Sequence, residues 1–279
     1  MPRGHTFRTW DDYFIPGTSV LRNKFTGPGK PYGEPDPDKL RLMEEAFAHT
    51  RIQELRDNPI EGRFDYDHMK AIHRAIFQDV YEWAGQERIA PVGQFMTKDG
   101  HAYYGAGPHL TAAAEAEYAK LARKNLLRGL EPAEFVDQLA ESWGEVDVIH
   151  FAREGNTRAQ FVFFSQLVEQ AGYRIDAAQF APGAPLRDEF VQARFHSQDT
   201  GRNDRLAAAL GQAITPFDRG PQAVQPGAET GSGLWRASYP QAASEATRQP
   251  PSASELQARG SGTYRAGRGG EATRSEGRT

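Results

Sequence analysis

The spacing of apolar residues over the first 217 positions predicts a series of amphipathic helices. Leu40, Met43 and Phe47 recur at three- and four-residue intervals, as on one face of a helix, and Asp36 followed by Pro37 is typical of a helix start. The same periodicity recurs in later segments, with Gly85 and Gly172 as stop signals. The expected helices cover residues 38–56, 65–84, 110–126, 131–149 and 156–171.

Two segments between residues 1 and 217 lack the helical spacing. The stretch "VGQFMTKDGHAYY" (92–104) has β-prone residues around a Lys-Asp-Gly turn, which predicts a short hairpin. Residues 1–36 contain aromatic side chains interrupted by Gly and Pro, and we expect them to lie as a lead-in across the surface of the domain. The fold class is therefore predicted to be mostly α, with a β-hairpin.

Residues 218–279 differ in composition from the rest of the chain. They are rich in Gly, Ser, Ala, Pro and Arg, with few aliphatic side chains, so they cannot bury enough apolar surface to offset chain entropy. We predict one domain over residues 1–217, with a core at about 38–180, and a disordered tail in which Trp235 and Tyr239 are candidates for occasional docking.

Composition excludes several classes of protein. The formal net charge is −4, so no general basic field would attract nucleic acid or an anionic membrane. The chain has no cysteine, which excludes disulfides, thiol catalysis and cysteine-ligated zinc. No apolar stretch resembles a secretory signal or a membrane span. We expect a cytoplasmic protein, and export as an effector without an N-terminal signal stays open.

The stretch "VIHFAREGNTRAQF" (148–161) concentrates the residues suited to chemistry. Gly155 permits a tight turn and Asn156 tolerates left-handed dihedral angles, so the N–H groups of residues 155–157 should converge at a helix N-terminus, a common phosphate-binding arrangement. Arg158 adds a cation in the first turn. Gly155, Asn156, Thr157 and Arg158 are therefore the candidate phosphate-binding residues.

A base and a metal ligand accompany this phosphate site. Glu154 is a carboxylate that can hold Mg²⁺ between phosphates, and His150 can accept a proton near neutral pH. Together the residues indicate transfer of a phosphate-containing group to a hydroxyl. The pair His68 and His73 is spaced by five residues, which does not favour a zinc site on one helical face.

The same stretch resembles the signature loop of Fic-domain proteins, His-x-Phe-x-(Asp/Glu)-Gly-Asn-Gly-Arg-x-x-Arg. "YFIPGTSVLRNKF", "AIHRAIFQDVYEWAGQER" and "QAGYRID" are similar to flanking segments of the family, so that the resemblance covers about residues 13–180. It implies a mostly helical protein adenylyltransferase, which moves AMP from ATP to a Ser, Thr or Tyr hydroxyl of a target protein. The target would dock by strand addition on a flap around residues 92–104.

The resemblance also implies roles for individual residues. His150 would be the catalytic base, Glu154 the Mg²⁺ ligand, and Arg158 the first arginine on the phosphate chain. Three positions depart from the family pattern: Phe151–Ala152 stands where the family has x–Phe, Thr157 replaces the second glycine, and Phe161 replaces the second arginine.

These departures leave two other functions open. One is a transferase of the same type that uses another phosphate donor or transfers phosphate, and the other is a catalytically inactive domain that binds a partner. The inhibitory (Ser/Thr)-x-x-x-Glu-(Gly/Asn) segment of the family is absent from the sequence, so a separate antitoxin protein is a candidate regulator. The sequence does not distinguish a toxin, an effector and a housekeeping modifier.

Overall fold

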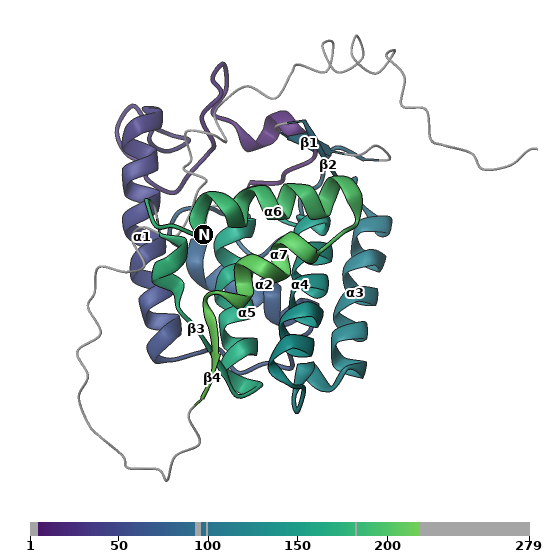
Figure 1. Cartoon of the computed structure of the whole chain (residues 1–279). Coiled ribbons are helices and arrows are strands. Elements are labelled where there is room, and N and C mark those ends of the chain that lie inside the picture. Colours follow the sequence, from purple (N-terminus) through teal and green to yellow (C-terminus); the bar gives the residue numbers. More distant parts are fainter. Residues whose placement is uncertain (1–4, 93–95, 99, 182, 218–279) are drawn as a thin grey trace, which may run out of the picture. The chain divides into compact units, whose positions relative to one another are not determined.

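The computed structural model describes residues 5–92, 96–98, 100–181 and 183–217, in which α-helices dominate (Figure 1). The prediction of a mostly α fold is confirmed. The helices are α1 (Pro37–Asp57), α2 (Tyr66–Phe77), α3 (Pro108–Arg123), α4 (Pro132–Ile149), α5 (Asn156–Gln170), α6 (Arg187–Thr200) and α7 (Asp204–Gly211). Short 3₁₀ turns cover Trp10–Tyr13, Asn125–Leu127 and Ala177–Phe180.

Two small antiparallel sheets accompany the helices in the described part of the chain. β1 (Met96–Lys98) pairs with β2 (His101–Tyr103), so the hairpin predicted within residues 92–104 is confirmed. β3 (Tyr173–Ile175) pairs with β4 (Ile214–Pro216), and this sheet was not expected from the sequence. Each strand has three residues, so packing against helices rather than strand pairing must hold both sheets in place.

The start signals of α1 and α2 act as the sequence indicates. The Asp36 carboxylate accepts hydrogen bonds from the N–H groups of Asp38 and Lys39, at 3.0 and 3.2 Å, and Pro37 is the first residue of α1. The Asp65 carboxylate accepts the N–H of His68 at 2.9 Å. These caps satisfy N–H groups that would otherwise lack partners.

The end of α2 differs from the prediction. The helix stops at Phe77 instead of continuing to Gly85, and the Phe77 carbonyl accepts the N–H groups of both Val80 and Tyr81. The segment then folds back so that the rings of Tyr81 and Trp83 stack with centroids 4.4 Å apart in the core. Burial of these two aromatic side chains outweighs the helical periodicity of the local sequence.

Helix α5 is the central element of the core. It packs against α1, α2 and α4, and nearly all its side chains are buried. Phe163, Phe164, Leu167 and Val168 are fully buried. The loop that carries the candidate chemistry leads directly into α5, so its position is fixed by the best-packed helix of the fold.

Helices α6 and α7 are additions to the predicted fold. The α6 sequence, "RDEFVQARFHSQDT", is mostly polar, and its periodicity is too weak to indicate a helix. It nevertheless packs on α4, α7 and β2 (Figure 1). Phe190, Ala193, Arg194 and Ser197 form its buried face, which therefore includes a charged residue.

Some predictions fall outside the described residues. These include the whole tail, 218–279, with Trp235 and Tyr239, and residues 93–95 and 99 of the hairpin segment. Within the part of the chain that the structure describes, no helix combines the length and the apolar character needed to span a bilayer.

Candidate active site

The loop between α4 and α5 is built around two residues with left-handed backbone angles. His150 ends α4 with φ 44°, and Gly155 precedes α5 with φ 81°. A Cβ atom at position 155 would lie 2.3 Å from the ring of Phe77. Glycine is therefore required at 155 for both conformation and space, as the sequence motif indicates.

Asn156 has a different role from the one expected of its conformation. It is the first residue of α5 and not left-handed. Its amide group instead closes the loop, because Oδ1 accepts the N–H of Ala152 at 2.9 Å while Nδ2 donates to the Ala152 carbonyl at 2.8 Å. The left-handed conformation is supplied by Gly155, and Asn156 contributes the side-chain hydrogen bonds that close the loop.

The N-terminus of α5 presents N–H donors toward this loop. The first bond of the helix runs from the Ala159 N–H to the Gly155 carbonyl, at 3.1 Å. The N–H groups of Asn156, Thr157 and Arg158 are thus the donors that a helix start leaves without intrahelical partners. The Gly155 N–H, which was predicted as a phosphate donor together with those of residues 156 and 157, instead donates to the Glu154 carboxylate at 3.0 Å. Such a helix end attracts anions.

His150 follows the last residue of α4, at the start of the loop, and is buried. Its ring is 4.4 Å from that of Tyr103 on β2, and Arg88 Nε donates to its carbonyl at 2.8 Å. Burial lowers the pKa of His150 well below its ordinary value, and the positive charges of Lys98, Arg88 and Arg194 lower it further. The imidazole is therefore neutral at pH 7 and can accept a proton.

The residues around Glu154 fit a magnesium ion that arrives with a nucleotide. One carboxylate oxygen accepts the Gly155 N–H, and the described residues contain no cluster of three or more acidic or histidine side chains for a metal. Mg²⁺ in proteins is commonly held by one or two carboxylates together with substrate phosphates and water. A single carboxylate beside an anion-binding helix end suits that mode.

Arg158 points into the core, toward α1 and the end of α2. Its guanidinium forms an ion pair with Glu44 of α1 and lies 4.6 Å from the centre of the Phe77 ring. Tyr81 also donates to Glu44. Burial works to lower the pKa of Arg158, but the carboxylates of Glu44 and Glu154 outweigh it and raise that pKa. Arg158 stays charged and is already engaged by Glu44.

The position of the second motif arginine is occupied by a buried aromatic residue. Phe161 is 1% exposed, and its ring contacts those of Trp143, Phe180 and Phe190 at centroid distances of 5.6, 5.6 and 6.4 Å. The displaced Phe151 is likewise buried, edge-on to Tyr66 and His73. Both departures from the family pattern are therefore accommodated by aromatic packing.

His73 is a loop-supporting residue that sequence reasoning considered only as a metal ligand. Its Nε2 donates to the Glu154 carbonyl at 2.8 Å, and its Nδ1 accepts the Gly85 N–H at 2.9 Å. These two bonds require the neutral ring, and burial lowers the pKa of His73 to about 4. The histidine spacing alone gave no signal of this role.

Arg88 ties the hairpin to the end of α4. It donates to the carbonyls of Tyr104 and His150, while its own N–H donates to the Phe151 carbonyl at 2.8 Å. Burial lowers its pKa to about 10, so it stays protonated at pH 7. The sequence signal was its place at the end of "AIHRAIFQDVYEWAGQER", a segment similar to the family, but no role followed from that.

The N-terminal lead-in packs onto the loop through Arg153. The Arg153 guanidinium lies over the rings of Trp10, Phe14 and Tyr13, at 4.2, 5.2 and 5.9 Å from their centres. Such contacts are worth most when the cation is desolvated, and Arg153 is buried. The segment 1–36, which we expected on the surface of the domain, therefore helps to hold the candidate loop.

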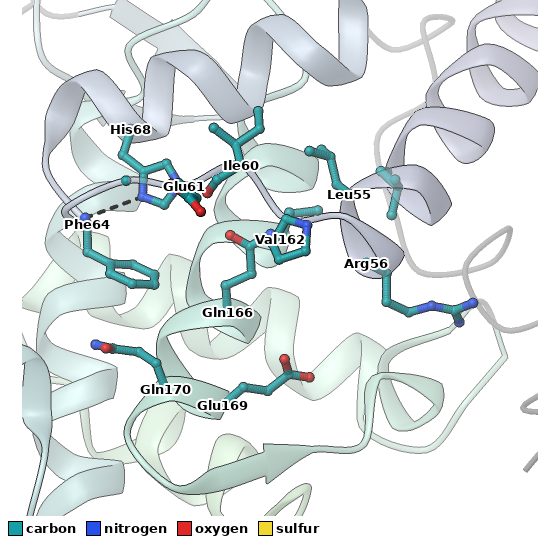
Figure 2. Close-up of a pocket in the computed structure, with 13 residues that line it drawn as sticks. Leu55, Arg56, Ile60, Glu61, Phe64, His68, Val162, Gln166, Glu169 and Gln170 are labelled. Carbon is teal, nitrogen blue, oxygen red and sulfur yellow. Dashed lines mark hydrogen bonds between the residues drawn. The ribbon is translucent and has the colours of Figure 1, made fainter. Parts of the chain in front are cut away.

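The structure also has a cavity of about 460 Å³ (Figure 2), and none of residues 150–158 lines it. Leu55 and Ile60 line it from the end of α1 and the loop that follows, and Val162, Gln166 and Glu169 line it from α5. The wall residues of α5 begin six positions after Asn156, about 9 Å along the helix. The cavity is therefore not part of the candidate active site.

Comparison with known proteins identifies the family. Residues 63–168 match the Fic/DOC family. VbhT, a protein adenylyltransferase of Bartonella schoenbuchensis, is 35% identical over 207 residues, which make up 74% of this chain and 40% of VbhT. A probable protein adenylyltransferase of Sinorhizobium fredii, y4lH, is 35% identical over 174 residues, covering 62% of this chain and 82% of y4lH.

Solved structures agree on the fold. The VirB-translocated effector BepC of Bartonella tribocorum, solved with bound AMPPNP, superposes with a TM-score of 0.64 at 24% identity, over 74% of this chain and 97% of that one. The chain belongs to the Fic/DOC family. It spans less than half the length of VbhT.

Proposed function

We propose that this protein transfers AMP from ATP to a hydroxyl group of a target protein. The observation that carries the proposal is a neutral, buried histidine on the loop that leads into a helix N-terminus, whose first N–H groups have no intrahelical partner. Its relatives VbhT and y4lH are named as protein adenylyltransferases, which supports the same chemistry.

His150 is the general base in this proposal. It accepts the proton of the target hydroxyl, whose oxygen then attacks the α-phosphorus of ATP, and pyrophosphate leaves with the electrons of the broken P–O bond. The N–H groups at the start of α5 bind phosphate oxygens and stabilise negative charge as it develops. Glu154 would hold Mg²⁺, which supplies further charge neutralisation when bound.

The hairpin β1–β2 is the proposed docking site for the target, by addition of a strand to its edge. Tyr103 on β2 contacts the His150 ring, so a segment paired with the hairpin would bring a hydroxyl close to the base. We place the protein in the cytoplasm, with export as an effector as the alternative. A separate antitoxin is the candidate regulator.

The test is transfer of label from ATP to proteins of a cell lysate in the presence of Mg²⁺. With ATP labelled at the α-phosphate, wild type should label a target, and His150→Ala should reduce the rate on the order of 10²–10⁴-fold. His109→Ala is the matched control, because His109 is exposed on α3 and should transfer at the wild-type rate. Full activity of His150→Ala would exclude the proposed base.

The role of Glu154 is tested separately by a magnesium titration. Glu154→Ala should lose the dependence of transfer on Mg²⁺ together with most of the activity. Glu145→Ala, on α4, removes a carboxylate that is exposed and should leave the titration unchanged. An unchanged titration of Glu154→Ala would show that the ion is held elsewhere.

A second candidate is transfer from a different phosphate donor, or of phosphate itself. It is favoured by two observations, namely that Phe161 is buried among aromatic rings and that Arg158 is paired with Glu44. Label retained from γ-labelled ATP, and not from α-labelled ATP, would identify phosphate transfer. Label from neither would favour another donor or a binding module.

A further inference from the structure

Arg194 of α6 reaches the start of α5 from outside the segment that matches the family. One of its terminal nitrogens donates to the Thr157 hydroxyl at 3.3 Å and forms an ion pair with Asp147 of α4. Arg194 is 7% exposed, and its buried Nε has no hydrogen-bond partner among the described residues. A buried guanidinium with an unused donor is costly unless an anion completes its bonding.

The surroundings of Arg194 favour a negatively charged ligand. Thr157 is in the first turn of α5, beside the N–H groups that have no intrahelical partners. The positive charges of Lys98, Arg88 and Arg194 all lower the pKa of His150. Lys98 belongs to the hairpin, Arg88 to the segment before it and Arg194 to α6, so three separate elements bring a cation near the base. Asp147 is the carboxylate that pairs with Arg194, and Glu87 is the carboxylate that acts on Arg88.

The contacts of α5 show which helix supplies a cation at its N-terminal end, where α5 itself has Phe161 in place of an arginine. Thr157 and Phe161 are one turn apart on the same face of α5. On this face, the ring of Phe161 packs against the ring of Phe190 of α6. Arg194 lies one turn after Phe190 on α6, and its guanidinium donates to the Thr157 hydroxyl. Arg158 faces the other way, toward Glu44.

We propose that Arg194 binds the phosphate chain of the nucleotide donor, and that Thr157 orients it. This assignment rests on the proposed function in taking Mg·ATP as the donor. It places a specificity-determining residue on α6, beyond the matched residues 63–168. The guanidinium supplies at the helix end the positive charge that Phe161 does not.

The test is calorimetric binding of Mg·ATP and of AMP to the full chain, which needs no turnover. Arg194→Gln should weaken ATP binding roughly 10- to 100-fold, which is about 1.4–2.8 kcal/mol, and leave AMP binding within about twofold. Arg205→Gln on α7 is the control, because it removes an exposed arginine, and it should bind both nucleotides as wild type does. Equal ATP affinity of Arg194→Gln and wild type would overturn the proposal.

A second variant separates phosphate binding from folding, because Arg194→Gln leaves Asp147 buried without its partner. Replacing both residues, Asp147→Leu with Arg194→Met, removes the ion pair and keeps apolar volume. The double variant should melt close to wild type and still bind ATP weakly. A stable double variant with wild-type ATP affinity would show that Arg194 serves only the fold, and would overturn the proposal.

The binding data also distinguish this inference from the proposed function. If α-labelled transfer occurs but Arg194→Gln binds ATP normally, only the role of Arg194 fails. If transfer does not occur but ATP affinity falls selectively in Arg194→Gln, the phosphate contact stands and AMP transfer fails. A wild-type protein that does not bind Mg·ATP overturns both.

Discussion

The ion pair between Glu44 and Arg158 allows a quantitative test of how this core is held together. Both side chains are almost fully buried, with 0% and 4% of their surfaces exposed, and Tyr81 donates to the same carboxylate. Glu44→Gln keeps the shape of the side chain but removes the counter-charge of Arg158. Breaking a buried pair in this way costs about 3–5 kcal/mol, because it leaves an uncompensated charge.

The expected value lies at the lower end of that range. The carboxylate of Glu154 also acts on Arg158 and compensates part of its charge after the substitution. We therefore expect Glu44→Gln to lower the free energy of unfolding by about 3 kcal/mol. Urea unfolding followed by the fluorescence of the buried Trp83 and Trp143 measures this directly.

The chain contains a matched control on its surface. Arg205 and Glu189 pair through two hydrogen bonds of 3.0 and 2.9 Å, but their side chains are 43% and 42% exposed. Glu189→Gln should therefore cost only about 0.2–1 kcal/mol. If Glu44→Gln costs no more than this control, the reasoning about burial is refuted. Glu44→Leu with Arg158→Met should recover most of the loss.

Three further predictions concern Phe161, Gly155 and His73. Phe161→Arg should destabilise the protein by several kcal/mol without tightening ATP binding, because the arginine would enter the aromatic cluster; a higher ATP affinity at unchanged melting temperature would contradict this. Gly155→Ala should lower the free energy of unfolding by well over the ~1–2 kcal/mol of left-handed backbone strain, because the new Cβ would clash with the Phe77 ring. Gly172→Ala is the control: its φ is 95° and the space around it is open, so it should cost only the backbone strain. His73 has a pKa of about 4 in the folded protein against an ordinary 6.5, so the unfolded chain binds more protons between these two pH values. The free energy of unfolding should therefore fall by up to ~3.4 kcal/mol as the pH drops from 6.5 to 4. A urea midpoint that does not change over this pH range would exclude a buried neutral His73.

The local signals in the sequence were reliable where one segment determines the outcome. The cap at Asp36, the hairpin turn and the glycine at 155 follow from backbone chemistry within a few residues, and all three are present in the structure. The loop from His150 to Arg158 also forms at the start of a helix, as its composition indicates.

Features that depend on distant parts of the chain did not follow from the sequence. Glu44 lies 114 positions from Arg158, and Arg194 lies 37 positions from Thr157, so no local spacing connects them. The polar sequence of α6 hides a helix whose buried face includes an arginine. The early end of α2 likewise arises from tertiary packing of Tyr81 and Trp83.

The position of α6 has a consequence for how the two substrates influence each other. This helix carries the hairpin, because the Phe195 ring stacks on His101 at 3.9 Å and Gln198 donates to the Ala102 carbonyl at 2.5 Å. Arg194, which directly precedes Phe195 and lies one turn before Gln198, donates to the Thr157 hydroxyl. If a target docks on the hairpin as proposed, a shift of the hairpin would be passed through α6 to Arg194, and thermodynamic linkage would make the effect mutual. Nucleotide and target would each change the affinity for the other by an equal factor.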